Sequence, residues 1–323
     1  MISLESTISD LNAWRDKRRR GEVTREQFWT AVQNDVQAIQ NMQLVNSTQI
    51  EMRVTRDELL IVYTLIDCAT TVTMLLQPAD LRSAPMTILS EGHYELLQED
   101  LIVELGRASK TLIDVGANIG FYSAACARAN PSLSVFAFEP NPELSDVFLR
   151  NMDLNGVARQ VKLHTVALSE SRSGDGQLHV PPHTGSGGGS LMNLHPEEGV
   201  AKVHRVESNT LQELFPSTQS CDLMKVDVEG NELSVLRGAL DLITRRHPTI
   251  VIELLRKWMK PFGAHPQDVI QLLIPLDYRC FAIEHNELRP IESISEKTSS
   301  TNFVFVHPSR KRHTALVEEL VKC

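Results

Sequence analysis

The stretch TLIDVGANIGFYSAACA, residues 111–127, decides the fold of this chain. It begins as a short apolar run through Asp114, turns at GANIG (116–120) and continues as a segment of small residues. A buried strand, a glycine-rich turn and a helix in this order predict the first βα unit of a doubly wound α/β sheet. Gly116 and Gly120 suit such a turn, because a side chain there would occupy the place of a ligand or block the packing of helix on strand.

The rest of the chain from Lys110 onward repeats this alternation of apolar runs and helical stretches, which indicates βαβ units and a parallel sheet. Runs such as TIVIELL are apolar throughout, as expected for strands that are buried on both faces. We expect seven strands, at Thr111–Val115, Val135–Glu139, Val161–Ala167, Asp222–Val228, Thr249–Leu254, Arg279–Glu284 and Asn302–Val306, with helices between them.

Residues 1–85 are expected to form a separate helical segment that precedes a domain at 86–323. The capping-box pattern at Thr24–Gln27 predicts a helix from Arg25 to about Met42. The apolar run 59–76 is about as long as a membrane span, but Asp67 and four threonines interrupt it, so we interpret it as a buried helix that Thr55 and Glu58 cap. This segment could recognise the substrate, cover the site or form a homodimer.

Composition narrows the class of protein. The net charge of −9 over 323 residues argues against a general nucleic-acid binder. The five cysteines are scattered, without the spacing of a zinc site, and are expected to be reduced thiols. The N-terminus lacks the charge and apolar order of a secretory signal. We therefore expect a cytoplasmic protein with no membrane or nucleic-acid partner.

An acidic residue at the end of the second expected strand predicts a nucleoside site. Glu139 lies 19 residues after Gly120, where doubly wound folds place a carboxylate that accepts hydrogen bonds from ribose hydroxyls. A dinucleotide fingerprint is absent, because Asn118 and Phe121 replace two of its glycines. Asp114 suits a ligand with an ammonium group. S-adenosylmethionine (SAM) has that group together with a ribose.

The chain resembles the FkbM-like family of SAM-dependent methyltransferases. The resemblance lies in DVGANIGFYS (114–123), FEPNP (138–142), LNG (154–156) and CDLMKVDVEGNELSVLRGA (221–239), with EGHYE (91–95) before the first strand. It covers about residues 90–307. It implies the class I methyltransferase fold, a Rossmann-like, seven-stranded, mostly parallel sheet whose last strand is antiparallel. Together with the glycine turn, it predicts that SAM is bound by Asp114, Gly116, Asn118, Gly120, Phe121, Glu139, Pro140, Asn141, Glu95 and Ser190.

Asp227 and Glu229 are the expected catalytic residues. They lie in KVDVEG (225–230), at the end of the fourth expected strand, and strand alternation would point both to one side. We expect one carboxylate to serve as a general base or to orient the acceptor, and the other to contact SAM or the substrate. The alternative is that they cap the next helix or pair with Lys225. A divalent metal held by these two residues and Glu253 is a less favoured alternative, and we expect no metal.

Several other positions are weaker candidates for the site. Tyr94, Phe121 and Tyr122 could face the sulfonium of SAM through cation–π contacts or belong to the core. The glycine-rich stretch 181–189 could be a mobile lid or only a connector, and Ser190 and Asn193 follow it. His195 and His285 are expected to be surface or packed residues rather than bases.

The leading functional hypothesis is O-methylation of a hydroxyl on a sugar or natural-product acceptor. N-methylation of a small molecule or a peptide is the alternative within the same class of enzyme, since carboxylates can serve either nucleophile. A non-catalytic scaffold with a SAM fold is the alternative outside enzymes. The resemblance does not identify the acceptor, which is expected to be a small molecule or a peptide.

Overall fold

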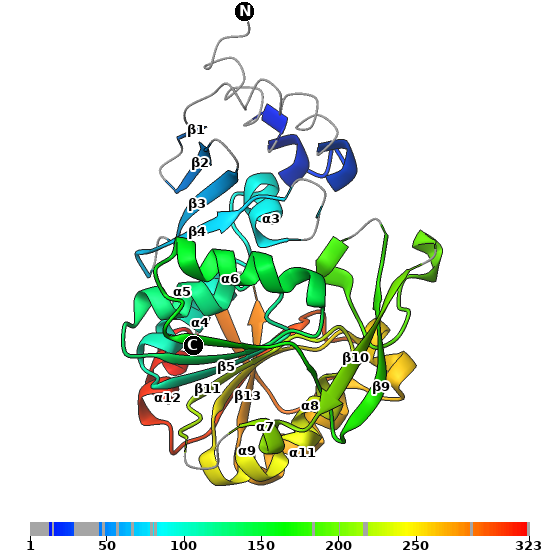
Figure 1. Ribbon diagram of the computed structural model, residues 1–323. Coiled ribbons are helices and arrows are strands. Elements are labelled where there is room, and N and C mark those ends of the chain that lie inside the picture. The colour runs from blue at the N-terminus through cyan, green and yellow to red at the C-terminus, as the bar shows by residue number, and fades with distance from the viewer. Residues whose placement is uncertain are drawn as a thin grey trace, which may run out of the picture.

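The strands after residue 110 form one eight-stranded sheet in the computed structural model, in the order β14-β13-β15-β12-β11-β5-β6-β7 (Figure 1). Strands β7, β6, β5, β11 and β12 pair in parallel, and β15 runs antiparallel between β12 and β13. The structure describes residues 13–14, 16–28, 45–46, 49–55, 58–65, 68–77, 80, 83–182, 185–199, 201–215, 219–284 and 287–321. The strands are β5 (Thr111–Val115), β6 (Ser134–Phe138), β7 (Val161–His164), β11 (Leu223–Val226), β12 (Thr249–Glu253), β13 (Arg279–Glu284), β14 (Glu287–Ile291) and β15 (Asn302–Val306).

The seven expected strands are all present, and the antiparallel last strand is confirmed. The sequence interpretation missed β14, which forms a hairpin with β13 at the edge of the sheet. It also extended two strands too far. The run 161–167 ends at His164 and resumes as the separate strand β8 (Ala167–Leu168), while the run 222–228 is a strand only from Leu223 to Val226.

Helices cover both faces of the sheet, as its apolar strands require. Neighbouring residues of β5 alternate between two apolar clusters: Leu112 packs with α4, α5 and α6, and Ile113 packs with α8, α9 and α11. The fold is therefore doubly wound (Figure 1). The helices are α3 (Ala84–Glu91), α4 (Leu97–Arg107), α5 (Phe121–Ala129), α6 (Ser145–Leu154), α7 (Leu211–Leu214), α8 (Glu232–Gly238), α9 (Leu240–Arg246), α10 (Arg256–Met259), α11 (Pro266–Leu273) and α12 (Lys311–Glu319).

The prediction that residues 1–85 are helical is wrong for residues 45–75. These residues form a four-stranded antiparallel sheet of β1 (Val45–Asn46), β2 (Ile50–Val54), β3 (Leu59–Leu65) and β4 (Thr70–Leu75). The expected buried helix at 59–76 is thus the β3–β4 hairpin. No helix among the described residues is both long and apolar enough to cross a membrane. The predicted helix after Thr24 begins as expected at 25–28, and residues 29–42 of it lie outside the described residues.

The error at 59–76 has a physical cause in the local signals. The Thr55 hydroxyl accepts a hydrogen bond from the Glu58 amide at 2.9 Å, as in a helix cap, but here it closes the turn between β2 and β3. Threonine makes this local bond in turns as readily as at helix ends. The signal for a strand was the alternation in β4, where Val72 and Met74 are buried and Thr71 and Thr73 are half-buried.

Asn151 on α6 and Asn155, which follows the last residue of that helix, attach the N-terminal sheet to the rest of the protein. Strand β4 is an edge strand, so its outward backbone groups need partners. The Asn155 side chain accepts from the Thr73 amide at 2.9 Å and donates to the Thr73 carbonyl at 2.7 Å. The Asn151 side chain accepts from the Leu75 amide at 2.8 Å and donates to the carbonyl of Ile119 at 2.8 Å. Asn151 therefore connects β4 directly to the glycine-rich turn.

Replacing Asn151 with alanine should lower the free energy of unfolding by about 3 kcal/mol, because it leaves two buried backbone groups without partners. Urea denaturation of both proteins measures this difference. The matched control is Asp153→Ala, an exposed position on the same helix, which should change stability by less than about 0.5 kcal/mol. Equal stability of the two variants would contradict the role given to Asn151.

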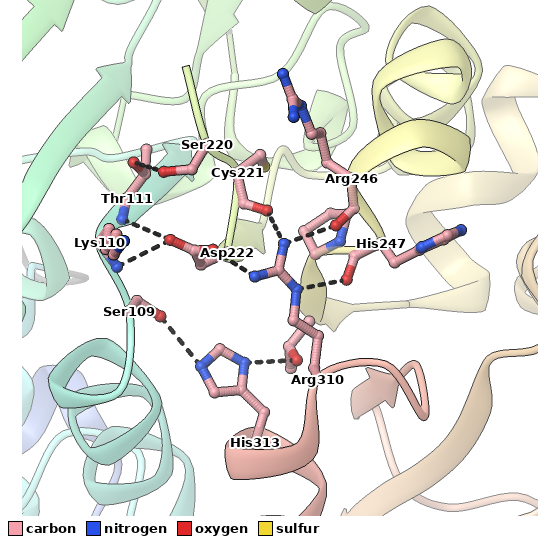
Figure 2. A network of polar contacts seen from close by, with 12 residues as sticks. Ser109, Lys110, Thr111, Ser220, Cys221, Asp222, Arg246, His247, Arg310 and His313 are labelled. Carbon is pink, nitrogen blue, oxygen red and sulfur yellow. Dashed lines mark hydrogen bonds and ion pairs between the residues drawn. The ribbon is translucent and has the colours of Figure 1, made fainter. Parts of the chain in front are cut away.

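The amino ends of the central strands are tied together by Arg310, which precedes α12 (Figure 2). Its guanidinium donates to the Asp222 carboxylate and to the carbonyls of Cys221, Arg246 and His247. Asp222 also accepts from the amides at 110 and 111. The network lies at the opposite end of the strands from the glycine-rich turn, so it stabilises the sheet without contacting that turn.

His313 joins this network and should make stability depend on pH. Its ring nitrogens lie 2.7 Å from the Thr249 hydroxyl and 3.2 Å from the Ser109 hydroxyl, and burial, assisted by Arg310, lowers its pKa from 6.5 to about 4. Between these values the unfolded chain binds more protons, so stability falls by up to about 3 kcal/mol as the pH drops from 6.5 to 4. Urea denaturation should show a smaller loss over this range in His313→Gln. Parallel profiles for the two proteins would contradict this.

A third, small sheet was not anticipated. It consists of β8, β10 (Lys202–Asn209) and β9 (Ser173–Val180), in the order β8-β10-β9. The glycine-rich stretch 181–189 follows β9 and includes a short 3-10 turn at Gly185–Gly188. Ser190 closes the loop by pairing with His179, so the stretch connects β9 to a cavity wall that is described next.

Candidate active site

A cavity of about 410 Å³ opens at the carboxyl ends of β5, β6, β11 and β12. This is where doubly wound folds bind ligands, because the strand order reverses between β5 and β11 and the loops diverge there. Its size fits a nucleoside-sized ligand. Of the expected cofactor residues, Glu95, Gly116, Asn118, Phe121, Glu139, Pro140 and Ser190 line it, as do both expected catalytic residues. Asp114, Gly120 and Asn141 lie outside the lining.

The glycines of the turn are needed for the close approach of protein segments. Gly116 has φ +72°, and a Cβ there would lie 1.7 Å from the backbone carbonyl oxygen of Asp227. Gly120 has φ +87°, and its Cβ would lie within 3 Å of Met152 and Phe148 on α6. Glycine at 116 therefore lets the β5 turn contact the end of β11, and glycine at 120 lets α6 pack against the turn.

Glu139 is buried at the end of β6 and holds the backbone of the glycine-rich turn beside the cavity. Its carboxylate accepts from the Asn118 amide at 2.9 Å and from the Asn141 amide at 2.8 Å. Burial raises its pKa to about 7, against the effect of these two bonds. Apolar side chains of Phe138, Val166 and Leu168 lie in the same wall. A carboxylate beside an apolar wall fits a nucleoside, whose ribose offers hydroxyl donors and whose base is flat.

Asp114 lies beneath the cavity. It is buried, accepts a hydrogen bond from the Ser123 hydroxyl at 2.6 Å, and has its pKa raised by burial. The negative charge of Asp114 raises the pKa of Lys225, which lines the cavity, and the positive charge of Lys225 lowers the pKa of Asp114. The family resemblance predicts a direct contact of Asp114 with SAM, and that role stays a prediction.

Glu95 and three aromatic rings also line the cavity. Tyr94 and Tyr122 both pack edgewise against Phe121, at ring distances of 5.0 and 5.3 Å. These rings belong to the apolar core and also line the cavity, and their contact with the sulfonium of SAM stays a prediction. The Tyr122 hydroxyl and the Gln98 amide donate to the Glu95 carboxylate. Burial and the nearby Asp227 raise the pKa of Glu95.

Asp227, Glu229 and Glu253 bring one oxygen each to within 4.8 Å of one another. Strand alternation does not explain this, because β11 ends at Val226 and Glu229 adopts the left-handed conformation with φ +55°. Glu253 ends β12, next to β11 in the sheet. Burial, together with the charges of Asp227 and Glu229, raises the pKa of Glu253 well above its usual value. Glu253 therefore keeps its proton to a higher pH than an exposed glutamate does.

Lys225 is a residue of this site that the sequence interpretation treated only as a pairing partner. Its ammonium is buried, lies 3.2 Å from the Asp227 carboxylate and donates to the carbonyl of Gly116 at 3.1 Å. Burial alone would lower the pKa of Lys225, but the carboxylates of Asp227, Asp114 and Glu95 raise it above its usual value. The alternative pairing of Lys225 with Asp227 thus exists, and it places both groups in the cavity wall.

The wall next to the cluster comes from two further segments. The Ser190 hydroxyl donates to the Glu229 carbonyl at 2.7 Å and so connects the glycine-rich loop to the turn after β11. Trp258 on α10 lines the cavity and packs edgewise against buried His195. His195 is therefore a packed residue, as expected; Asn193 is exposed and outside the lining; and His285 lies outside the described residues. Neither Trp258 nor Arg25, which also lines the cavity, carried a sequence signal.

The comparisons with known proteins agree with this geometry. Residues 114–280 match the methyltransferase FkbM domain. Methyltransferase sdnD of Sordaria araneosa is 31% identical over 188 residues, which cover 48% of this chain and 69% of that protein. The hexuronic acid methyltransferase AglP of Haloferax volcanii is 31% identical over 174 residues, which cover 54% and 65%. The chain thus spans about two thirds of the length of these relatives.

A solved structure also resembles the chain, at greater distance. The methyltransferase FkbM of Methylobacillus flagellatus KT shares 18% identity over 61% of this chain and 44% of its own, with a TM-score of 0.39. The assignment therefore rests on the domain match and on the curated relatives. The glycine turn, the buried Glu139 and the carboxylate cluster all lie within or beside the matched residues, and the chain belongs to the FkbM-domain family of SAM-dependent methyltransferases.

Proposed function

We propose that this protein transfers the methyl group of SAM to a hydroxyl of a sugar or a sugar-like natural product. The observation that carries the proposal is the cluster of Asp227, Glu229 and Glu253 at the edge of the SAM cavity. SAM supplies an electrophilic methyl carbon when it is bound. A hydroxyl is a weak nucleophile until its proton is removed, so a carboxylate within hydrogen-bonding reach has a direct role in the reaction.

The residues of the cluster have distinct tasks in this proposal. Glu253, whose pKa is raised, donates a hydrogen bond toward Asp227 in its protonated form. Lys225 holds Asp227 in place from the other side. Glu229 and Asp227 then orient the acceptor hydroxyl, and one of them takes its proton. The aromatic wall of Tyr94 and Tyr122 keeps water away from the reacting atoms.

The choice of acceptor is supported by a relative. AglP is named a hexuronic acid methyltransferase, and it is 31% identical to this chain over 174 residues. Five carboxylates in the cavity wall, from Glu95, Glu139, Asp227, Glu229 and Glu253, also suit a ligand rich in hydroxyl donors. N-methylation of an amine or a peptide remains the alternative acceptor chemistry, and a non-catalytic scaffold remains the alternative without transfer.

The proposal is tested in two stages. Calorimetric titration with S-adenosylhomocysteine should show micromolar binding, with NAD as the control that does not bind. Methyl transfer is then measured by mass spectrometry on methyl glucuronoside, methyl glucoside and glucosamine, and fragmentation locates the new methyl group on oxygen or nitrogen. A methyl ether on a sugar hydroxyl is the expected product. Methylation of nitrogen alone would refute O-transfer, and binding without transfer to any of a broad panel would favour the scaffold.

Treatment with a chelator tests the alternative that the carboxylate cluster holds a divalent metal. Asp227, Glu229 and Glu253 offer oxygen ligands of the kind that Mg²⁺ prefers. However, the Lys225 ammonium already lies 3.2 Å from Asp227 and neutralises part of the charge that would attract a cation. Transfer should therefore be unchanged after treatment with EDTA. A loss that added Mg²⁺ restores would assign a metal to the cluster.

A further inference from the structure

Arg25 reaches the SAM cavity from a part of the chain far outside the matched domain. It begins the helical turn 25–28, which Thr24 and Gln27 cap reciprocally at 3.1 and 2.9 Å. The preceding segment is fixed to the end of α3, where the Arg19 guanidinium donates twice to the carbonyl of Glu91, at 3.0 and 2.9 Å. The capping-box prediction at Thr24 is thus confirmed, and the turn it begins forms part of the cavity wall.

The side chain of Arg25 is held from α3. Its Nη2 donates to the hydroxyl of Thr87 at 3.3 Å, and Thr87 is buried and also lines the cavity. The Thr87 side chain on α3 and the N-terminal turn therefore both position the guanidinium. Tyr94, Asn118 and Ile119 line the same cavity, so the guanidinium shares a ligand space with the glycine-rich turn.

The guanidinium of Arg25 is one of few positive charges in a mostly acidic cavity wall. Five carboxylates line the wall, from Glu95, Glu139, Asp227, Glu229 and Glu253. Among the described lining residues, only Arg25 and Lys225 are cationic. The Lys225 ammonium is buried against Asp227 and the carbonyl of Gly116. Arg25 therefore brings positive charge to a wall that is otherwise mostly acidic, and a bound anion would be attracted there.

SAM carries one anionic group, the carboxylate of its amino-acid part, beside two cationic groups, the ammonium and the sulfonium. The acidic wall suits the two cations, whereas the carboxylate needs a cationic partner. We propose that Arg25 binds the amino-acid carboxylate of SAM, which its planar guanidinium can hold with two hydrogen bonds. A carboxylate on the acceptor, such as that of a uronic acid, is the other source of the same charge. The proposal rests on SAM binding and not on the identity of the acceptor.

Calorimetric titration of the full-length protein with two ligands separates these sources. S-adenosylhomocysteine has the amino-acid carboxylate, and 5′-methylthioadenosine has the same nucleoside and thioether without the amino acid. Arg25→Ala should weaken binding of the first about 10- to 100-fold and leave binding of the second within about twofold. Arg25→Lys should give an intermediate loss, because it keeps the charge without the planar fork. Thr87→Val should also weaken binding of S-adenosylhomocysteine and not of 5′-methylthioadenosine, but by a smaller factor than Arg25→Ala.

Arg20→Ala is the matched control, since Arg20 is exposed on the same segment and pairs with Glu22. It should leave both affinities unchanged, and thermal unfolding verifies that each variant is folded. Unchanged affinity of Arg25→Ala for S-adenosylhomocysteine would overturn the proposal and leave the acceptor as the source of any anion at Arg25. An equal loss of affinity for both ligands would also overturn it, because a purely structural role of Arg25 would affect the binding of both. Binding by the wild type without methyl transfer would refute the proposed function and leave this inference intact.

Discussion

Replacing Glu229 with glutamine should lower kcat about 100- to 10,000-fold while the affinity for S-adenosylhomocysteine stays within about threefold. The range is that of a lost general base. Glutamine matches glutamate in size and tolerates the left-handed backbone at this position equally well, so the turn should be kept. The measurement is single-turnover transfer to the acceptor found with the sugar panel, together with calorimetry for the cofactor side.

Asp227→Asn should also reduce kcat strongly, but it is a less clean test. It leaves the buried ammonium of Lys225 without its nearest carboxylate, and breaking a buried pair of this kind destabilises a protein by several kcal/mol. Its thermal unfolding must be measured beside its activity. Asp241→Asn, an exposed carboxylate on α9, serves as the control and should behave as the wild type. Near-normal kcat in both Glu229→Gln and Asp227→Asn would remove these carboxylates from the mechanism.

Deleting residues 1–82 should prevent stable folding rather than only alter the choice of acceptor. One apolar cluster runs from β2, β3 and β4 into α4, α5 and α6, and Ile61, Tyr63 and Met74 are at most 1% exposed within it. Burial of each such side chain contributes about 1.5–3 kcal/mol. These three alone are comparable to the whole stability of a typical domain, about 5–15 kcal/mol.

The deletion is tested by thermal unfolding and size-exclusion chromatography. The truncated chain should aggregate or lack a cooperative transition, and it should not bind S-adenosylhomocysteine. Point variants give a graded version: Ile61→Ala should cost about 2–4 kcal/mol, and Glu51→Ala, on the same sheet, less than about 0.5 kcal/mol. A truncated protein that melts cooperatively and binds the ligand would show that the segment is separable. Its oligomeric state would then test the proposed dimer interface.

Patterns within short stretches of sequence were sufficient to predict the main sheet and the acidic residue at the end of β6. The order of strand, glycine turn and helix at 111–127 is a local property, and buried parallel strands are apolar throughout. The same kind of reasoning failed at 59–76, because a long apolar run is compatible with a buried helix and with a buried hairpin. There the hairpin is decided by pairing of β3 with β2 and β4 and by the Asn151 and Asn155 contacts to the edge strand.

The sequence by itself determined that a cofactor site lies after β5 and that Asp227 and Glu229 belong to it, since their positions follow from the order of the strands. Only the tertiary structure decided which distant residues complete that site. Glu253 meets Asp227 because β12 pairs with β11, and Arg25 faces the same cavity because its turn is fixed to α3. Contacts between residues so far apart in the chain depend on the packing of whole elements, which leaves no periodic trace in the sequence.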